Sequence, residues 1–174
     1  MDKIEAAVRH YKDNYLPHIQ NLLDWYASLD SLDEAIDNAS LGKDERGKRH
    51  PHQRRLEELK MLRARYYLLG FRERIASLSS FKELLYIVEG VAKKVDGLGE
   101  LYAYDTALRI GSFIGTFPET VYLHAGARVG AKALGVDTKV KSVELRSLPK
   151  PFHSLEPHQA EDVLCIYKKL LERL

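Results

Sequence analysis

Apolar residues recur at three- and four-residue steps along most of the chain, which is the spacing of one face of an α-helix. The first such section covers residues 4–26, and we expect Pro17 to bend or split it. Ser31 followed by Glu34 has the pattern of a capping box, which predicts a short helix that Gly42 ends. The N-terminal quarter of the chain therefore predicts helices connected by short turns.

The middle of the chain carries the longest helical pattern. Pro51 suits the first turn of a helix, and the apolar period then continues to Ile75. Ser79 or Ser80 can cap the next helix, which the two glycines of residues 97–99 stop. Arginines interrupt the apolar positions of the first of these helices: Arg54, Arg55, Arg63, Arg65, Arg72 and Arg74. The pattern predicts a long helix with a basic flank.

The C-terminal half predicts three more helices. The first ends near Gly115, the second runs from Pro118 to Leu134, and the last begins near Pro157. Between the last two, residues 140–152 contain two prolines and predict either a short strand or an extended loop. Glycines and alanines make the second of these helices narrow, which favours close packing of another backbone against it.

Size and composition agree with a folded, all-α protein. The chain has 174 residues, of which 45% are hydrophobic and 30% charged, as in a globular protein. We expect a single domain over residues 1–174, formed by a compact bundle of about six or seven helices. A single cysteine and the lack of any long apolar run predict a cytoplasmic protein with no membrane partner.

Charge is distributed unevenly along the chain, although the net charge is only +2. Residues 1–42 contain three Lys and Arg against eight Asp and Glu, a net charge of −5. Residues 43–74 contain eleven against five, a net charge of +6. The basic section favours an anionic partner such as nucleic acid, and the two opposite sections could instead meet each other or a second copy of the chain.

The segment from Val95 to Ala103 carries the strongest functional pattern, because Gly97-Leu98-Gly99 lies between two helical sections. It resembles a helix-hairpin-helix motif over residues 95–114. In that family a Gly-hydrophobic-Gly turn joins two short helices, and a small residue four positions after the second glycine, here Ala103, allows close packing. The resemblance implies a helix-hairpin-helix unit that binds DNA. The chain as a whole also resembles uncharacterised prokaryotic proteins, and that resemblance implies no chemistry.

The same segment departs from the catalytic branch of the helix-hairpin-helix superfamily, the base-excision DNA glycosylases. The members that also cleave the DNA backbone have a lysine two residues after the second glycine, where this chain has Leu101. They also use an aspartate further downstream, where this chain has Glu119. A glycosylase- or nuclease-like activity therefore loses its main chemical support.

Physical chemistry gives the glycine turn a function of its own. Free amides at the start of the second helix can bind a phosphate, and Lys93 and Lys94 precede the turn with two positive charges. Contacts of this kind predict binding to the nucleic-acid backbone, with DNA favoured over RNA and little dependence on base sequence. The alternative is that Gly97 and Gly99 only end one helix and begin the next.

A second candidate binding segment contains His50, His52, Arg54 and Arg55. Two histidines separated by one residue can both face a phosphate or a metal ion, and arginines favour forked bonds to phosphate. A solvated start of the basic helix is the alternative, because no third metal ligand is adjacent in sequence. We therefore assign these residues to nucleic-acid binding and predict no metal and no cofactor.

A catalytic alternative comes from two pairs that each lie one helical turn apart: Asp105 with Arg109, and His124 with Arg128. If their helices pack together, Asp105 and His124 form an acid–base pair, and the two arginines bind an anionic group. This arrangement would give an enzyme acting on a nucleic-acid or phosphorylated substrate. The alternative is two ordinary intrahelical contacts. The leading hypothesis from sequence is nucleic-acid binding, with an enzyme or a helical protein-interaction module, including a homo-oligomer, as alternatives.

Overall fold

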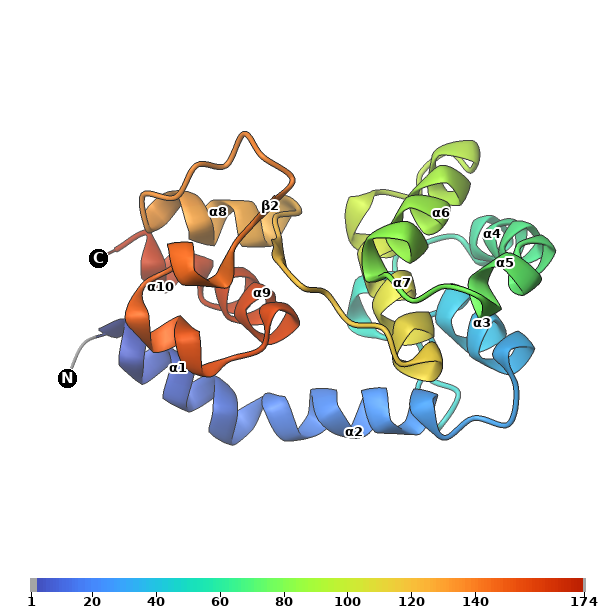
Figure 1. Cartoon of the computed structure of the whole chain (residues 1–174), viewed down its shortest axis with the longest axis horizontal. Coiled ribbons are helices and arrows are strands. Elements are labelled where there is room, and N and C mark those ends of the chain that lie inside the picture. The colour runs from blue at the N-terminus through green and yellow to red at the C-terminus, as the bar shows by residue number, and fades with distance from the viewer. Residues whose placement is uncertain (1–2, 174) are drawn as a thin grey trace. The chain divides into compact units, whose positions relative to one another are not determined.

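The computed structural model describes residues 3–173, and its regular structure is helical apart from one short antiparallel ladder (Figure 1). Within that range there are ten α-helices, three short 3-10 helices and two strands of two residues each. The prediction of a mainly helical protein is confirmed. No helix in the described part of the chain is long and apolar enough to span a membrane.

The chain divides into two compact units. The terminal unit combines the N-terminal segment up to Gln20 with the chain from Pro118 onwards, and the central unit is Asn21–Phe117. The single domain over residues 1–174 stays a prediction, and the helices are distributed over two units and not over one bundle of about six or seven. The reason is that the N-terminal helix shares a separate core with the C-terminal section.

The central unit is arranged around α7 (Glu100–Ile114), which packs against α6 (Phe81–Lys94) and α3 (Leu32–Ser40) (Figure 1). Helix α4 (Glu58–Gly70) packs on α3 and α6, and α5 (Arg72–Ala76) follows α4 directly. Each helix turns its apolar stripe inward, as its periodicity predicts. The fully buried side chains of this core include Ile36, Met61, Leu68, Ile75, Leu84 and Ile110.

The N-terminal helical section is split as Pro17 predicted. Helix α1 (Lys3–Asn14) ends before Tyr15, and α2 (Leu16–Ala27) then begins with the proline in its first turn. The end of α2 belongs to the central unit, where the hydroxyl of Ser112 donates a 2.7 Å hydrogen bond to the carbonyl of Leu23.

The terminal unit is built on two closely packed helices, α8 (Ala125–Ala133) and α9 (Pro157–Ile166). A Cβ atom added at Gly130 would lie 2.2 Å from the carbonyl oxygen of Leu164, so only glycine permits this approach. Helix α10 (Lys168–Leu171) packs on both helices, and α1 packs on α9. The narrow helix predicted from the glycines and alanines is confirmed.

A two-stranded ladder and two short 3-10 helices complete the terminal unit. Strand β1 (Val121–Tyr122) pairs antiparallel with β2 (Ser142–Val143). The 3-10 helices η2 (Leu145–Ser147) and η3 (Lys150–Ser154) connect β2 to α9. The unit's core includes Tyr11, Val121, Leu123, Phe152, Val163 and Leu164.

Two predicted helix starts are wrong. The helix expected from Pro118 begins only at Ala125, because the β-branched and aromatic residues before it pair with β2 instead. The long basic helix does not begin at Pro51, which opens the short 3-10 helix η1 (Pro51–Gln53). It begins at Glu58 and is interrupted at Phe71, where α5 takes over.

Candidate functional site

The glycine turn joins α6 to α7, as the sequence predicted. Gly97 has φ +88°, a left-handed conformation that favours glycine, and Leu98 beside it is buried. Ala103 is also buried, one turn into α7, where its amide donates a 3.1 Å hydrogen bond to the carbonyl of Gly99. Leu98 therefore anchors the turn in the core while the glycines on either side of it remain exposed.

The structure requires glycine at residue 97 but not at residue 99. A Cβ atom at Gly97 would lie 3.0 Å from Nζ of Lys60, and the positive φ would strain any other residue. Gly99 is the N-cap of α7 with φ −102°, and a Cβ atom added there meets nothing within 4 Å. The fold thus tolerates a side chain at residue 99. Because Gly99 has none, the first amides of α7 are open to an approaching ligand.

Lysines from two helices lie next to this turn. Lys60 of α4 lies against Gly97 and also forms a 3.1 Å ion pair with Glu57, one helical turn before it. Lys93 and Lys94, in the last turn of α6, are exposed. The acidic Asp96 and Glu100 are exposed on either side of the glycines and reduce the local positive charge.

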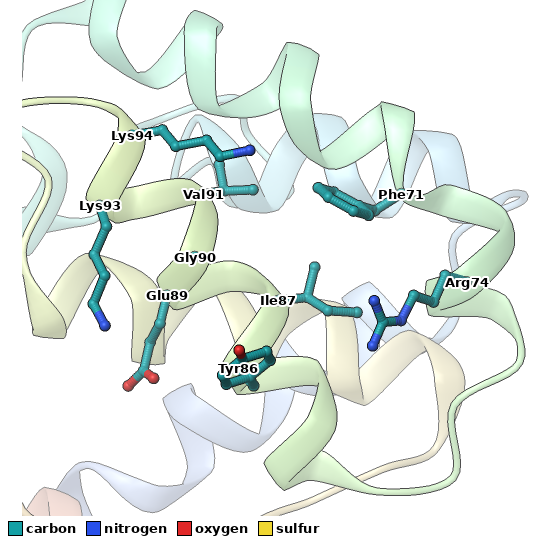
Figure 2. A pocket seen from close by; sticks show the side chains of 9 residues that line it. All are labelled: Phe71, Arg74, Tyr86, Ile87, Glu89, Gly90, Val91, Lys93 and Lys94. Atoms are coloured by element: carbon teal, nitrogen blue, oxygen red, sulfur yellow. The ribbon is translucent and has the colours of Figure 1, made fainter.

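A surface pocket of about 260 Å³ lies along α6, and Lys93 and Lys94, which precede the turn, line it (Figure 2). Figure 2 shows its apolar side chains, Phe71 and Ile87, between the cationic ends of Arg74 and Lys94 in this view. Nζ of Lys94 lies 5.6 Å from the ring centroid of Tyr67, a cation–π distance. Tyr86, which also lines the pocket, is 73% exposed. The pocket therefore combines cations and the carboxylate of Glu89 with an exposed aromatic ring and apolar side chains.

The basic charge of α4 and the segment before it is only partly free. Arg54, Arg55 and Arg63 are exposed, as predicted, although only Arg63 lies on the helix and Arg54 and Arg55 precede it. Arg65 forms an ion pair with Asp37 of α3, and Arg72 lies 3.5 Å from Asp33 of the same helix. The acidic N-terminal section thus neutralises part of the basic section within one unit.

The predicted histidine segment meets Asp105 in the central unit. Nδ1 of His52 lies 3.2 Å from Oδ2 of Asp105, and the rings of His50 and His52 are edge to face with centroids 4.8 Å apart. Gln53, buried beneath them, donates a 2.9 Å hydrogen bond from Nε2 to Oδ2 of Asp105. Its Oε1 accepts a 3.2 Å hydrogen bond from the guanidinium of Arg109. We call the five residues His50, His52, Gln53, Asp105 and Arg109 the histidine cluster.

The charge states in the histidine cluster follow from burial and from Arg109. Burial lowers the pKa of His50 to about 4, and the positive charge of Arg109 acts in the same direction, so the imidazole is neutral at pH 7. Burial of Asp105 opposes its ionisation. The hydrogen bonds from His52 and Gln53 and the charge of Arg109 outweigh that effect and lower the pKa of Asp105 to about 2. Asp105 is therefore a carboxylate.

The loop that carries the histidines is held at several points, although its composition is that of a solvated loop. The amide of His50 donates a 2.7 Å hydrogen bond to the carbonyl of Gly42. The backbones of Lys43 and Arg49 form an isolated antiparallel β-bridge across the loop. The hydroxyl of Tyr26 donates a 2.6 Å hydrogen bond to the carbonyl of Lys43. These contacts fix the direction in which the segment enters η1.

The four residues of the predicted catalytic group are divided between the units: Asp105 and Arg109 lie in the central unit, and His124 and Arg128 lie in the terminal unit. Each pair has contacts within its own unit. Asp105 is bound by His52 and Gln53, whereas Nε2 of His124 lies 2.7 Å from Oε1 of Glu161, with both side chains 5% exposed. Arg128 donates to the backbone carbonyls of Leu123, Thr138 and Val140. The observed acid–base pairs are therefore His52–Asp105 and His124–Glu161, and Arg128 stabilises the backbone of its own unit.

Sequence reasoning missed three residues of these sites. Lys60 reaches the glycine turn from another helix, and Gln53 and Glu161 are polar residues buried beside Asp105 and His124. For Glu161 a signal was present, since it interrupts the apolar positions of α9, but the pattern does not name its partner.

Comparisons of the chain with protein-family models, curated proteins and solved structures returned no match. The geometry of the described residues therefore carries the functional interpretation.

Proposed function

We propose that the protein binds nucleic acid through the phosphate backbone at the α6–α7 turn, with DNA favoured over RNA. One observation carries the proposal: Lys60 lies against Gly97, Lys93 and Lys94 end the helix before the turn, and the second glycine of the turn has no structural need to be glycine. A cationic surface and bare backbone amides at one place form a phosphate-binding arrangement.

Each part of this arrangement has a separate role in the proposal. The amides at the start of α7 donate to one phosphate, assisted by the positive end of the helix dipole. Lys93 and Lys94 neutralise neighbouring phosphates and release their counterions. Neither contact reads a base edge, so the binding is largely independent of base sequence.

An exposed aromatic side chain on α6 favours unpaired strands. The ring of Tyr86, which is 73% exposed, offers a surface on which a base can stack. Stacking requires bases that are free of the duplex. We therefore expect single-stranded DNA to bind more tightly than a duplex of the same length.

The test measures fluorescence anisotropy of labelled single- and double-stranded DNA over a salt series. The wild-type affinity is expected to fall steeply with salt, and in the Lys93→Ala/Lys94→Ala variant the slope of log affinity against log salt should decrease by about two. Lys82→Ala, at an exposed position in the first turn of the same helix, is the matched control and should change the slope little. Absence of binding at low salt, or an equal loss in the control, contradicts the proposal.

A second variant separates the backbone contact from simple charge attraction. Gly99→Ala adds a methyl group that meets no protein atom within 4 Å, so stability should be nearly unchanged. The methyl group stands where the phosphate would approach, and we expect affinity for DNA to fall several-fold. Unchanged affinity would remove the turn from the binding surface and leave only the lysines.

A further inference from the structure

We propose that His50, His52 and Asp105 together bind a divalent transition-metal ion of the zinc type. Each of the three side chains offers one ligand atom, and these atoms all lie within 4.8 Å of one another. Two imidazoles with one carboxylate form a common protein ligand set for such ions. The site is independent of the nucleic-acid surface at the α6–α7 turn.

The separations suit a single ion. Ligand atoms about 2.1 Å from a tetrahedral ion lie about 3.4 Å from each other, and Nδ1 of His52 is 3.2 Å from Oδ2 of Asp105. The largest separation among the three ligand atoms is at most 4.8 Å, so closure around an ion requires a movement of at most about 1.4 Å. The other two separations both involve His50, which is partly exposed and can make that movement.

The surroundings of the carboxylate are those of a metal ligand. Ligating carboxylates are usually oriented by hydrogen bonds from neighbouring residues. Here Gln53 donates to Oδ2 of Asp105 at 2.9 Å, and Arg109 donates to the other end of the same amide at 3.2 Å. Gln53 and Arg109 are 1% and 4% exposed, so this orientation is fixed from inside the core.

The elements that carry the ligands are also fixed before any ion binds. Asp105 is on α7, the central helix of its unit. The amide of His50 is bound to Gly42, where a Cβ atom would lie 2.9 Å from Gln53, so the loop packs directly on the residue that orients Asp105. A site on such elements loses little entropy when the ion enters.

The arrangement also defines the class of ligand. Imidazole nitrogens favour Zn²⁺, Co²⁺ or Fe²⁺ over Mg²⁺ and Ca²⁺, which prefer oxygen ligands. Three protein ligands leave at least one coordination position for water or an anion. Arg109, which donates to Gln53 at 3.2 Å, adds a positive charge near the site and favours an anion at that position.

The experiment titrates metal-free protein with Zn²⁺ in competition with a chromophoric chelator, and repeats the titration with Co²⁺ monitored by visible absorption. One equivalent should bind, and His52→Asn and Asp105→Asn should each weaken binding at least ~10-fold. His18→Asn, an exposed histidine outside the histidine cluster, is the matched control and should retain wild-type affinity. Circular dichroism checks the fold, and the exposed position of His52 keeps that variant informative if Asp105→Asn does not fold.

The outcomes distinguish this site from the proposed function and from other ions. Loss of binding in both cluster variants with retention in His18→Asn supports the site, whereas equal Zn²⁺ affinity in all four proteins overturns it. Tighter binding of Mg²⁺ than of Zn²⁺ also overturns it. The Lys93→Ala/Lys94→Ala variant should bind the metal normally, so failure of DNA binding leaves the metal result unaffected. Titration with Fe²⁺ under anaerobic conditions decides between zinc and iron.

Discussion

Each unit contains a histidine–carboxylate pair, and the two pairs differ in their exposure to solvent. In the terminal unit, His124 and Glu161 approach to 2.7 Å and each side chain is 5% exposed. In the central unit, His52 and Asp105 are 3.2 Å apart, with side chains 43% and 15% exposed. A histidine–carboxylate pair enclosed in the core has no access for a ligand, whereas a pair at the edge of a loop can exchange its contact for an ion or a phosphate.

The energetic consequences differ as well. A buried pair depends on both partners, because removal of one leaves a desolvated polar group beside a cavity. In the central pair His52 is largely solvated, and Asp105 keeps the hydrogen bond from Gln53 when His52 is lost, so the contribution of His52 to stability is small. The terminal pair is therefore expected to matter for folding and the central pair for binding.

The largest expected effect is the loss of stability in His124→Ala. Removing the imidazole leaves the buried carboxylate of Glu161 without this contact, which should lower the free energy of unfolding by about 3–5 kcal/mol. His52→Ala, the matched change in the central unit, should cost less than about 1 kcal/mol. Urea unfolding followed by circular dichroism measures both values, and equal losses would remove the distinction between the two pairs.

The single tryptophan allows a sharper version of that measurement. Trp25 lies in the part of α2 that belongs to the central unit. If His124→Ala destabilises only the terminal unit, circular dichroism should report its unfolding at lower urea than tryptophan fluorescence does. Coincident transitions in the variant would mean that the two units unfold as one.

The second effect is a dependence of stability on pH in the terminal unit. Burial lowers the pKa of His158 to about 4, below the unfolded value near 6.5. As the pH falls, the unfolded chain therefore takes up a proton before the folded chain does. The contribution of the neutral His158 to the free energy of unfolding is complete above pH 6.5 and is lost as the pH falls to about 4. His158→Leu should flatten the stability profile in this window by up to about 3 kcal/mol. If the free energy of unfolding, measured with urea from pH 7 to 4, depends on pH in the variant as it does in the wild type, the assignment to His158 is contradicted.

The third effect compares one glycine in each unit. Gly130→Ala in α8 places a methyl group against the carbonyl of Leu164 and should destabilise the protein by about 1–3 kcal/mol. Gly90→Ala in α6 meets no atom within 4 Å and should stabilise the protein by up to about 1 kcal/mol through helix propensity. Thermal melting measures both shifts, and a stabilising Gly130→Ala would show that α8 and α9 can separate without cost.

Helix caps and glycine turns were predicted correctly from the sequence, because they depend on residues that are neighbours in the chain. The hydroxyl of Ser31 caps α3 by accepting a hydrogen bond from the amide of Glu34, and Gly115 ends α7 with φ +75°, both as the sequence predicts. Gly97 has the positive φ that a glycine turn allows. In each case the signal and the structure lie within a few residues of each other.

Contacts between distant segments were not predictable in the same way. The short connection between their helices predicts that Asp105 pairs with His124, whereas the partner of Asp105 in the structure is His52, 53 residues away. An apolar period identifies the buried face of a helix but not the element that covers it. For the same reason the sequence did not reveal that the N-terminal helix shares a core with the C-terminal section.

The smallest effect tests whether the turn of the central unit binds an anion. Glu100 is exposed in the first turn of α7, where its negative charge competes with a phosphate for the helix amides. Glu100→Gln should therefore strengthen DNA binding about two- to five-fold, equivalent to roughly 0.3–1 kcal/mol, with the increase diminishing at high salt. Glu83→Gln, exposed in the first turn of α6, removes the same charge from a helix start distant in sequence from the turn and is the matched control. Anisotropy titrations at low salt measure both variants. A larger gain in Glu83→Gln would indicate that net charge alone, and not the α6–α7 turn, determines the affinity.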